Sequence, residues 1–242
     1  MARTIGAPFL LGITFAVSAL AATSAATLSA PLDIQLGFSS LPSAQGFAYA
    51  ASGSHANILE SSVFSVAGGV LTQNTMGQSN GVAGGSLLYQ RVGGITTTES
   101  KEIRVRARCL AAEGSSIARF GQGGFLFGFA QGSVQYDFGL TPSRIFVLQP
   151  SGTLLIAGTY DNTQFHDYRF EFSSPNTFRL YRDGALIYTG SDGFAVVINR
   201  VFLGDGTGGA NAKGEITSFR FIQDVATESR ATTWGRLKAI YR

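Results

Sequence analysis

The sequence predicts an all-β protein, a two-sheet antiparallel jelly-roll sandwich. Short extended segments recur about every 8 to 12 residues, a spacing typical of sandwiches and barrels. Glycine pairs such as Gly93-Gly94 and Gly123-Gly124 separate the segments, where glycine permits turn conformations that other residues avoid. Between the N-terminal region and residue 224, no stretch has a convincing helical period.

Each expected strand is a short run in which apolar and polar residues alternate, or an apolar run bounded by turn residues. The segment 166–190 contributes a further strand and a hairpin. The other strands are expected at 33–38, 47–52, 63–66, 70–75, 87–92, 101–110, 117–121, 125–130, 134–140, 144–148, 154–158, 196–204 and 214–223.

The hairpin is marked by Asp183-Gly184, which predicts a two-residue type I′ turn because both residues tolerate a positive φ. Such a turn sets Leu180 opposite Ile187 and makes that side of the hairpin the core face. The opposite, partly solvent-exposed face is then formed by Arg179, Tyr181, Leu186 and Tyr188.

Composition indicates one large β domain, which we expect to span residues 27–223. The chain has 242 residues, of which 45% are hydrophobic and 31 are glycine. Charged residues make up 14%, too few for a disordered protein. The net charge of +3 comes without a cluster of basic and aromatic residues, which argues against a nucleic-acid partner.

Residues 1–26 resemble a signal peptide. Arg3 precedes an apolar stretch from 7 to 20, and small-residue cleavage sites follow at 19–21 and 24–26. An uncleaved anchor is the alternative, but the second half is rich in Ala, Ser and Thr, which are weak membrane formers. We therefore expect a secreted or cell-surface protein without stable membrane insertion after cleavage.

Cys109 is the only cysteine, so this apparently exported chain has no internal disulfide. It shares strand parity with Ile103, Val105 and Ala107, which predicts a buried, small apolar residue. With two histidines and one cysteine in the chain, an ordinary zinc site is excluded.

The C-terminal tail, residues 224–242, differs from the rest of the chain. Trp234, Leu237 and Tyr241 share one stripe of a helix. The tail could dock on the domain, pair with a partner or lie on an acidic surface, and docking is the favoured interpretation for a segment this short.

Four motifs carry a resemblance to a known family: Tyr168-Arg169-Phe170, Asp183-Gly184, Leu203-Gly204-Asp205-Gly206 and Phe219-Arg220-Phe221. They resemble the last third of the concanavalin A-like lectin/glucanase superfamily, close to its laminin G-like branch. The resemblance implies two packed antiparallel sheets in a jelly roll. Because each motif is structural, it supports the fold more than a function.

The resemblance implies that an enzyme of this superfamily would be a glycoside hydrolase. Such an enzyme needs two carboxyl groups about 5 to 10 Å apart. No acid in the sequence has another acid two positions away. Asp167 and Glu171 lie about 13 Å apart on one strand face, with Arg169 between them holding both ionised. Asp137 and Glu215 could converge from different strands, although no pattern marks them. We therefore expect that the chain is not an enzyme.

Carbohydrate binding uses exposed aromatic rings beside polar groups. The candidates on the partly solvent-exposed face of the hairpin are Arg179, Tyr181 and Tyr188. The polar loop that begins at Gln73 and Asn74 flanks them. The competing interpretation is that the tyrosines cover a second apolar layer.

Calcium is the one cofactor for which the sequence offers ligands, the oxygens of Asp161, Asn162 and Asp205. Turn chemistry explains Asp161-Asn162 equally well. We expect no other cofactor.

Arg104, Arg106 and Arg108 form a stripe on one strand face, able to meet the anionic groups of a glycan or a cell envelope. Glu102 on the same face favours a solvated, ion-paired surface instead.

Together these patterns predict a secreted, non-catalytic β-sandwich that binds carbohydrate or cell-surface glycan. The alternatives are a structural or adhesive surface protein attached through its tail, and a glycoside hydrolase.

Overall fold

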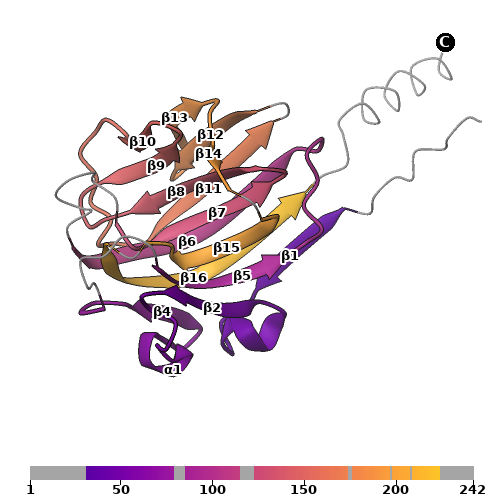
Figure 1. Ribbon diagram of the computed structural model, residues 1–242. Coiled ribbons are helices and arrows are strands. Elements are labelled where there is room, and N and C mark those ends of the chain that lie inside the picture. Colours follow the sequence, from indigo (N-terminus) through magenta and orange to yellow (C-terminus); the bar gives the residue numbers. More distant parts are fainter. Residues whose placement is uncertain are drawn as a thin grey trace, which may run out of the picture.

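The computed structural model describes residues 31–78, 85–114, 123–173, 176–196, 198–207 and 209–223. Within these ranges the chain forms sixteen strands in two antiparallel sheets. Figure 1 shows the sheets stacked as two layers. The expected all-β sandwich is confirmed.

The first layer, sheet A, contains the N-terminal and C-terminal strands of the described chain. Its strands are β1 (Leu32–Leu36), β3 (Phe64–Ala67), β4 (Val70–Asn74), β6 (Lys101–Glu113), β11 (His166–Ser173), β12 (Thr177–Arg182), β13 (Ala185–Gly190) and β16 (Asn211–Gln223). They are ordered β13-β12-β11-β6-β16-β4-β3, and β1 also pairs with β16.

The second layer, sheet B, is formed by the segments between those strands. Its strands are β2 (Ala48–Gly53), β5 (Gly85–Val92), β7 (Leu126–Gln131), β8 (Val134–Leu140), β9 (Ile145–Gln149), β10 (Gly152–Leu155), β14 (Phe194–Ala195) and β15 (Arg200–Asp205). They are ordered β10-β9-β8-β7-β15-β5-β2, and β14 also pairs with β8.

Helical structure in the described chain is limited to the 3₁₀ helix η1 (Pro42–Gln45) and the helix α1 (Glu60–Val63). Each is about one turn long, too short to produce the helical period that sequence analysis looks for. No helix among the described residues is long and apolar enough to cross a membrane.

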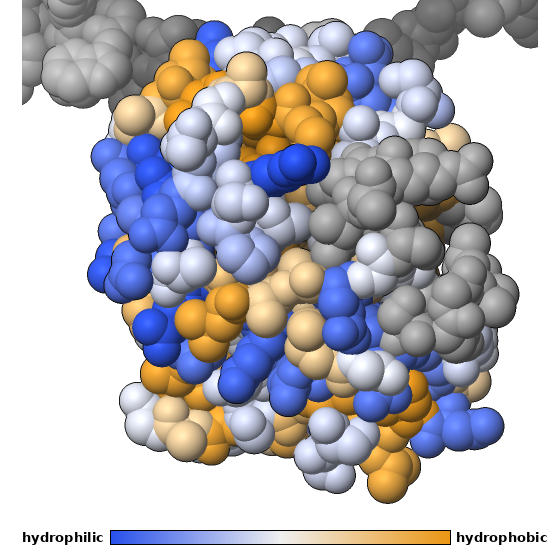
Figure 2. All heavy atoms as spheres, turned by 90° about the vertical axis from the view of Figure 1, so that its left-hand side faces the viewer, coloured by the Kyte–Doolittle hydropathy of each residue, from blue (hydrophilic) through white to orange (hydrophobic). Residues whose placement is uncertain are grey.

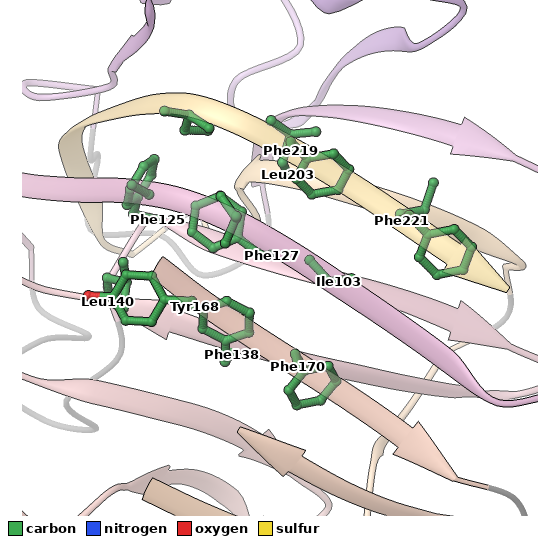
Figure 3. Packing of buried hydrophobic residues seen from close by; sticks show 14 of the residues in the cluster. Ile103, Phe125, Phe127, Phe138, Leu140, Tyr168, Phe170, Leu203, Phe219 and Phe221 are labelled. Carbon is green, nitrogen blue, oxygen red and sulfur yellow. The ribbon is translucent and has the colours of Figure 1, made fainter. Parts of the chain in front are cut away.

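The core lies between the sheets and is dominated by aromatic rings. Alternate residues of each strand point into it, as the period of an extended chain requires. Phe138 of sheet B packs against Phe170 of sheet A, with ring centroids 5.7 Å apart. Figure 3 shows these two rings beside Phe127, which lies 5.4 Å from Phe138. All three side chains are fully buried.

Cys109 lies on the core face of β6 and is fully buried, as predicted. Burial raises the pKa of its thiol to about 12, against a weaker lowering by its hydrogen bond to the Ala111 carbonyl. The thiol is therefore neutral at physiological pH and packs as a small apolar group.

The hairpin between β12 and β13 confirms one prediction and corrects another. Asp183 and Gly184 both have positive φ, 51° and 82°, as a type I′ turn requires. The register then shifts, so Leu180 pairs with Tyr188 rather than Ile187. The extra residue turns Tyr188 to the core side, where its hydroxyl accepts a hydrogen bond from Gln149.

The outer face of sheet A is a network of ion pairs. Arg106 and Arg108 of the predicted stripe pair with Asp167 and Glu215 on neighbouring strands, at 2.9 and 2.7 Å. Arg104 pairs with Glu102. The solvated interpretation of the stripe is confirmed, since each arginine has a carboxylate partner.

The predicted signal peptide at 1–26, the strand at 117–121 and the tail at 224–242 lie outside the described residues. These assignments, with the domain limits that depend on them, stay predictions.

Truncation of the core is expected to be costly. Phe138→Ala removes a fully buried ring and should lower the free energy of unfolding by about 3 to 5 kcal/mol. Leu59→Ala is the control, because this side chain is 71% exposed, and should cost under about 0.5 kcal/mol. Urea unfolding measures both, and similar losses would contradict the packing described above.

Candidate functional site

The outer face of sheet B differs from that of sheet A because its polar groups contact one another across strands. The pairing register places Gln135 of β8 between Phe194 of β14 and Ala130 of β7. Ala130 in turn pairs with Arg200 of β15. Side chains that pair directly lie on the same face of a sheet. Phe194, Gln135 and Arg200 therefore form one row, which we call the Arg200 row.

A second row runs beside it and contains an acid. Asp137 pairs with Gly128, Gly128 with Phe202, and Phe202 with Gln90. Gly128 is needed here, because a Cβ at this position would lie 2.7 Å from Cζ of Phe202. The Phe202 ring can therefore lie across the middle of the sheet.

Hydrogen bonds connect the two rows. Arg200 donates from one terminal nitrogen to Gln90 Oε1 at 2.9 Å and from the other to Gln135 Oε1 at 3.2 Å. Gln135 Nε2 donates to Asp137 Oδ2 at 2.5 Å, and the backbone N–H of Leu148 donates to Oδ1 at 3.2 Å. The chain of contacts fixes the guanidinium and both amides in single orientations.

Asp137 is almost completely buried beneath this network. Burial raises the pKa of its carboxyl to about 6, and the hydrogen bonds from Gln135 and Leu148 oppose the increase. The carboxyl therefore changes charge in a range near neutral pH, which is unusual for an aspartate.

A pocket of about 380 Å³ opens on this face, a size at the lower end of small-molecule sites. Phe194 forms an apolar wall and is 42% exposed. The lining consists of Gln135, Leu148, Gln149, Gly152, Thr153, Phe194, Val196, Arg200 and Gly206.

Exposed apolar side chains lie near this pocket. Leu154 and Leu155 of β10 and Phe194 of β14 are all more than one third exposed. Figure 2 shows a hydrophobic area beside hydrophilic residues in the upper part of the molecule, at the height where Figure 1 places these strands. An apolar surface next to oriented polar groups is a usual property of a binding site.

The residues predicted to bind a ligand do not share one surface. Arg179 is exposed, and Tyr181 lies on the outer face of sheet A with the Arg169 guanidinium 4.0 Å from its ring. Tyr188 points toward the core, so the expected common face of the tyrosines is wrong. The cause is the extra residue in β13, which the turn sequence does not reveal.

Gln73 and Asn74, the two loop residues predicted to bind the ligand, also differ in exposure. Gln73 is buried and donates from Nε2 to the Gly124 carbonyl at 2.6 Å, whereas Asn74 is exposed at the end of β4. A binding role for these five residues stays a prediction.

Two of the predicted calcium ligands are already hydrogen-bonded. Asn162 donates to the carbonyls of Thr141 and Arg144, and its Oδ1 accepts from the Tyr168 hydroxyl. Asp161 accepts from the backbone N–H of Thr163, which is turn chemistry.

Asp205, the third, is fully buried and accepts from the Thr75 hydroxyl at 2.7 Å and the Thr207 N–H at 3.0 Å. Burial raises the pKa of its carboxyl to about 8, against these hydrogen bonds. Among the described residues no three His, Cys, Asp or Glu side chains form a metal-binding group. Calcium binding stays a prediction.

Asp137 and Glu215 do not converge. Asp137 belongs to the outer face of sheet B, whereas Glu215 pairs with Arg108 on the outer face of sheet A. The two carboxyl groups are thus on opposite sides of the sandwich.

The residues that form the pocket wall and floor were not predicted. Arg200 interrupts an apolar run, and Gln135 alternates with aromatic residues in β8. Both are signals of a polar group on a strand face, but only the pairing of β14, β8, β7 and β15 shows that the faces are the same.

Comparisons with known proteins support the fold. No protein-family model and no curated protein matches the sequence. Among solved structures, a protein of unknown function from Shewanella oneidensis MR-1 has a TM-score of 0.50 and 15% identity over 81% of this chain and 87% of its own. A Bacillus licheniformis β-glucanase has a TM-score of 0.49 and 15% identity over 78% and 97%.

A lichenase from a mouse hindgut metagenome has a TM-score of 0.46 and 14% identity over 80% of this chain and 99% of its own. This chain also matches 16% of a sialidase. At such identities the comparison shows the fold alone, a two-sheet jelly-roll sandwich, which is consistent with the resemblance to the concanavalin A-like superfamily.

The expectation that the chain is not an enzyme is corrected by this comparison, because glucanases are among the structures it resembles. The expectation depended on the spacing of acids along one strand. Residues of a sheet face come from several strands, so spacing within one strand does not exclude a catalytic site.

Asp205 should make stability depend on pH. Its folded pKa of about 8 exceeds the unfolded value of about 3.9, so the unfolded chain loses a proton that the folded chain retains. Its contribution is full below about pH 4 and is lost as pH rises towards about 8, by at most about 1.4 kcal/mol per pH unit. Asp205→Asn should remove this dependence.

Urea unfolding at about pH 5 and pH 8 measures the effect. Relative to the parent protein, the free energy of unfolding of Asp205→Asn should be higher at about pH 8 than at about pH 5. Equal pH slopes in the two proteins would contradict a raised pKa for Asp205.

Proposed function

We propose that this protein binds a glycan in the pocket beside Phe194, on the outer face of sheet B. The observation that carries the proposal is an exposed aromatic ring next to a row of polar groups fixed by hydrogen bonds. A sugar presents an apolar C–H face and a rim of hydroxyls, which such a surface complements.

Each part of the pocket has a separate role in this proposal. Phe194 would contact the face of a sugar ring. Gln135 and Thr153 would supply donors and acceptors for its hydroxyls. Because the chain of hydrogen bonds already holds Gln135, little side-chain entropy would be lost on binding.

The location proposed for this activity is outside the cell or at its surface. Support comes from the predicted signal peptide at 1–26. Attachment to a surface through the tail at 224–242 belongs to the same proposal, since that segment has its own apolar stripe.

Phe194→Ala should weaken glycan binding at least about tenfold, about 1.4 kcal/mol, because it removes the apolar wall. The measurement is titration calorimetry of the full chain against a panel of neutral and acidic oligosaccharides. Leu186→Ala is the matched control, an exposed apolar residue on β13 of the other sheet. Equal loss in both variants, or none in Phe194→Ala, would contradict the site.

Hydrolysis of the bound glycan is the second candidate function, and Asp137 favours it. Its carboxyl lies beneath Gln135, which lines the pocket, and its pKa of about 6 suits a general acid. The usual mechanism needs a second carboxyl group. Among the described strands of sheet B the only other acid is Asp205. Its position in β15 places its side chain on the core side of the sheet.

Release of reducing ends from the same panel tests this candidate. If hydrolysis is the function, Asp137→Asn should abolish release while oligosaccharide affinity stays within about threefold. Release at the parental rate by Asp137→Asn would contradict a catalytic role for Asp137.

A further inference from the structure

We infer that the glycan is acidic and that Arg200 binds the carboxylate of a uronic acid unit. This inference rests on the proposed function, because it names the substrate class of the same pocket. It is carried by the charge of the lining, the contacts of Arg200 and the absence of a direct ion pair with a carboxylate for it among the described residues.

The pocket lining carries one charged side chain, the Arg200 guanidinium. No aspartate or glutamate is among its lining residues. The other polar side chains there are neutral amides and a hydroxyl, which bind sugar hydroxyls but do not distinguish an acid from its ester. Discrimination by charge would therefore depend on Arg200.

Arg200 has N–H donors that no hydrogen bond within the described chain uses. A guanidinium carries five N–H bonds, and two of them go to Gln90 and Gln135. Within the described chain its Nε is buried without a hydrogen-bond partner. Because the Nε is out of contact with solvent, the N–H bonds available to a ligand are the second N–H of each terminal nitrogen.

Arg200 interacts electrostatically with the buried Asp137 but, unlike the arginines of the sheet A network, forms no direct ion pair with a carboxylate of the described chain. On the outer face of sheet A, Arg106 and Arg108 each pair with a carboxylate. Across the described residues, no acid lies within ion-pair distance of Arg200. The oxygens of Asp137 instead accept from Gln135 and the Leu148 backbone.

The orientation of the guanidinium suits a planar anion. Contacts to Gln90 and Gln135 hold its two terminal nitrogens, and the Phe202 ring lies 4.9 Å from its centre. A fixed, planar fork of donors matches the two oxygens of a carboxylate better than a single neutral hydroxyl. A sulfate ester is the other anion that sugars carry, and the experiment separates the two.

The probes are oligogalacturonate and oligomannuronate, the methyl ester of each, and a sulfated oligosaccharide from κ-carrageenan, which carries no carboxylate. Calorimetry of the full chain should show at least about tenfold tighter binding of one uronate than of its ester. Arg200→Gln should remove most of that difference and leave the affinity for the ester within about threefold.

Two further variants make the result specific. Arg200→Lys keeps the charge but not the fork, and should recover part of the preference. It also replaces Arg200→Gln in the test if that variant does not fold, as judged by its melting curve. Arg144→Gln is the matched control, an exposed arginine in the β8–β9 connection, and should bind like the parent protein.

If a uronate and its ester bind equally and Phe194→Ala weakens both, the inference of an acidic substrate is overturned and the proposed function stands. No binding of any probe or panel member would overturn both. Tighter binding of the sulfated oligosaccharide than of either uronate would overturn the carboxylate assignment. A uronate preference that survives Arg200→Gln would overturn the role of Arg200.

Discussion

The packing of aromatic rings between the two sheets is the constraint on which the rest of this structure depends. Phe129 of β7 contacts Phe172 of β11 and Phe221 of β16, and such contacts hold the layers together. Because side chains alternate along a strand, every residue that enters the core fixes its neighbours on an outer face. The core thereby decides which polar residues can meet, and it separates Asp137 from Glu215.

The two outer faces have different electrostatic characters. On sheet A, arginines and carboxylates from neighbouring strands neutralise one another, as Arg106 and Asp167 do. On sheet B, Arg200 is held by amides, and the nearby Asp137 is buried with a raised pKa. Exposed ion pairs contribute little to stability, whereas a half-buried cation without a direct ion pair is costly unless a ligand compensates it. The second arrangement is therefore the one that suggests function.

The sequence predicts local features well. The alternation in β6 places Cys109 in the core, and Asp183-Gly184 forms the expected turn. The extra residue in β13 and the alignment of Phe194, Gln135 and Arg200 across four strands were not predictable, because both depend on pairing between distant segments. The expected common face of Tyr181 and Tyr188 was consequently wrong, while the fold itself was predicted correctly.

Chemical-shift mapping of the ¹⁵N-labelled protein with a bound oligosaccharide tests the central claim most directly, that ligands occupy the outer face of sheet B. The account predicts the largest shifts at the side-chain amide of Gln135, the Arg200 Nε–H and the backbone of Phe194. The backbone of Tyr181, on the opposite face, should not shift. Large shifts at Arg179 and Tyr181 with none at Gln135 would contradict the account.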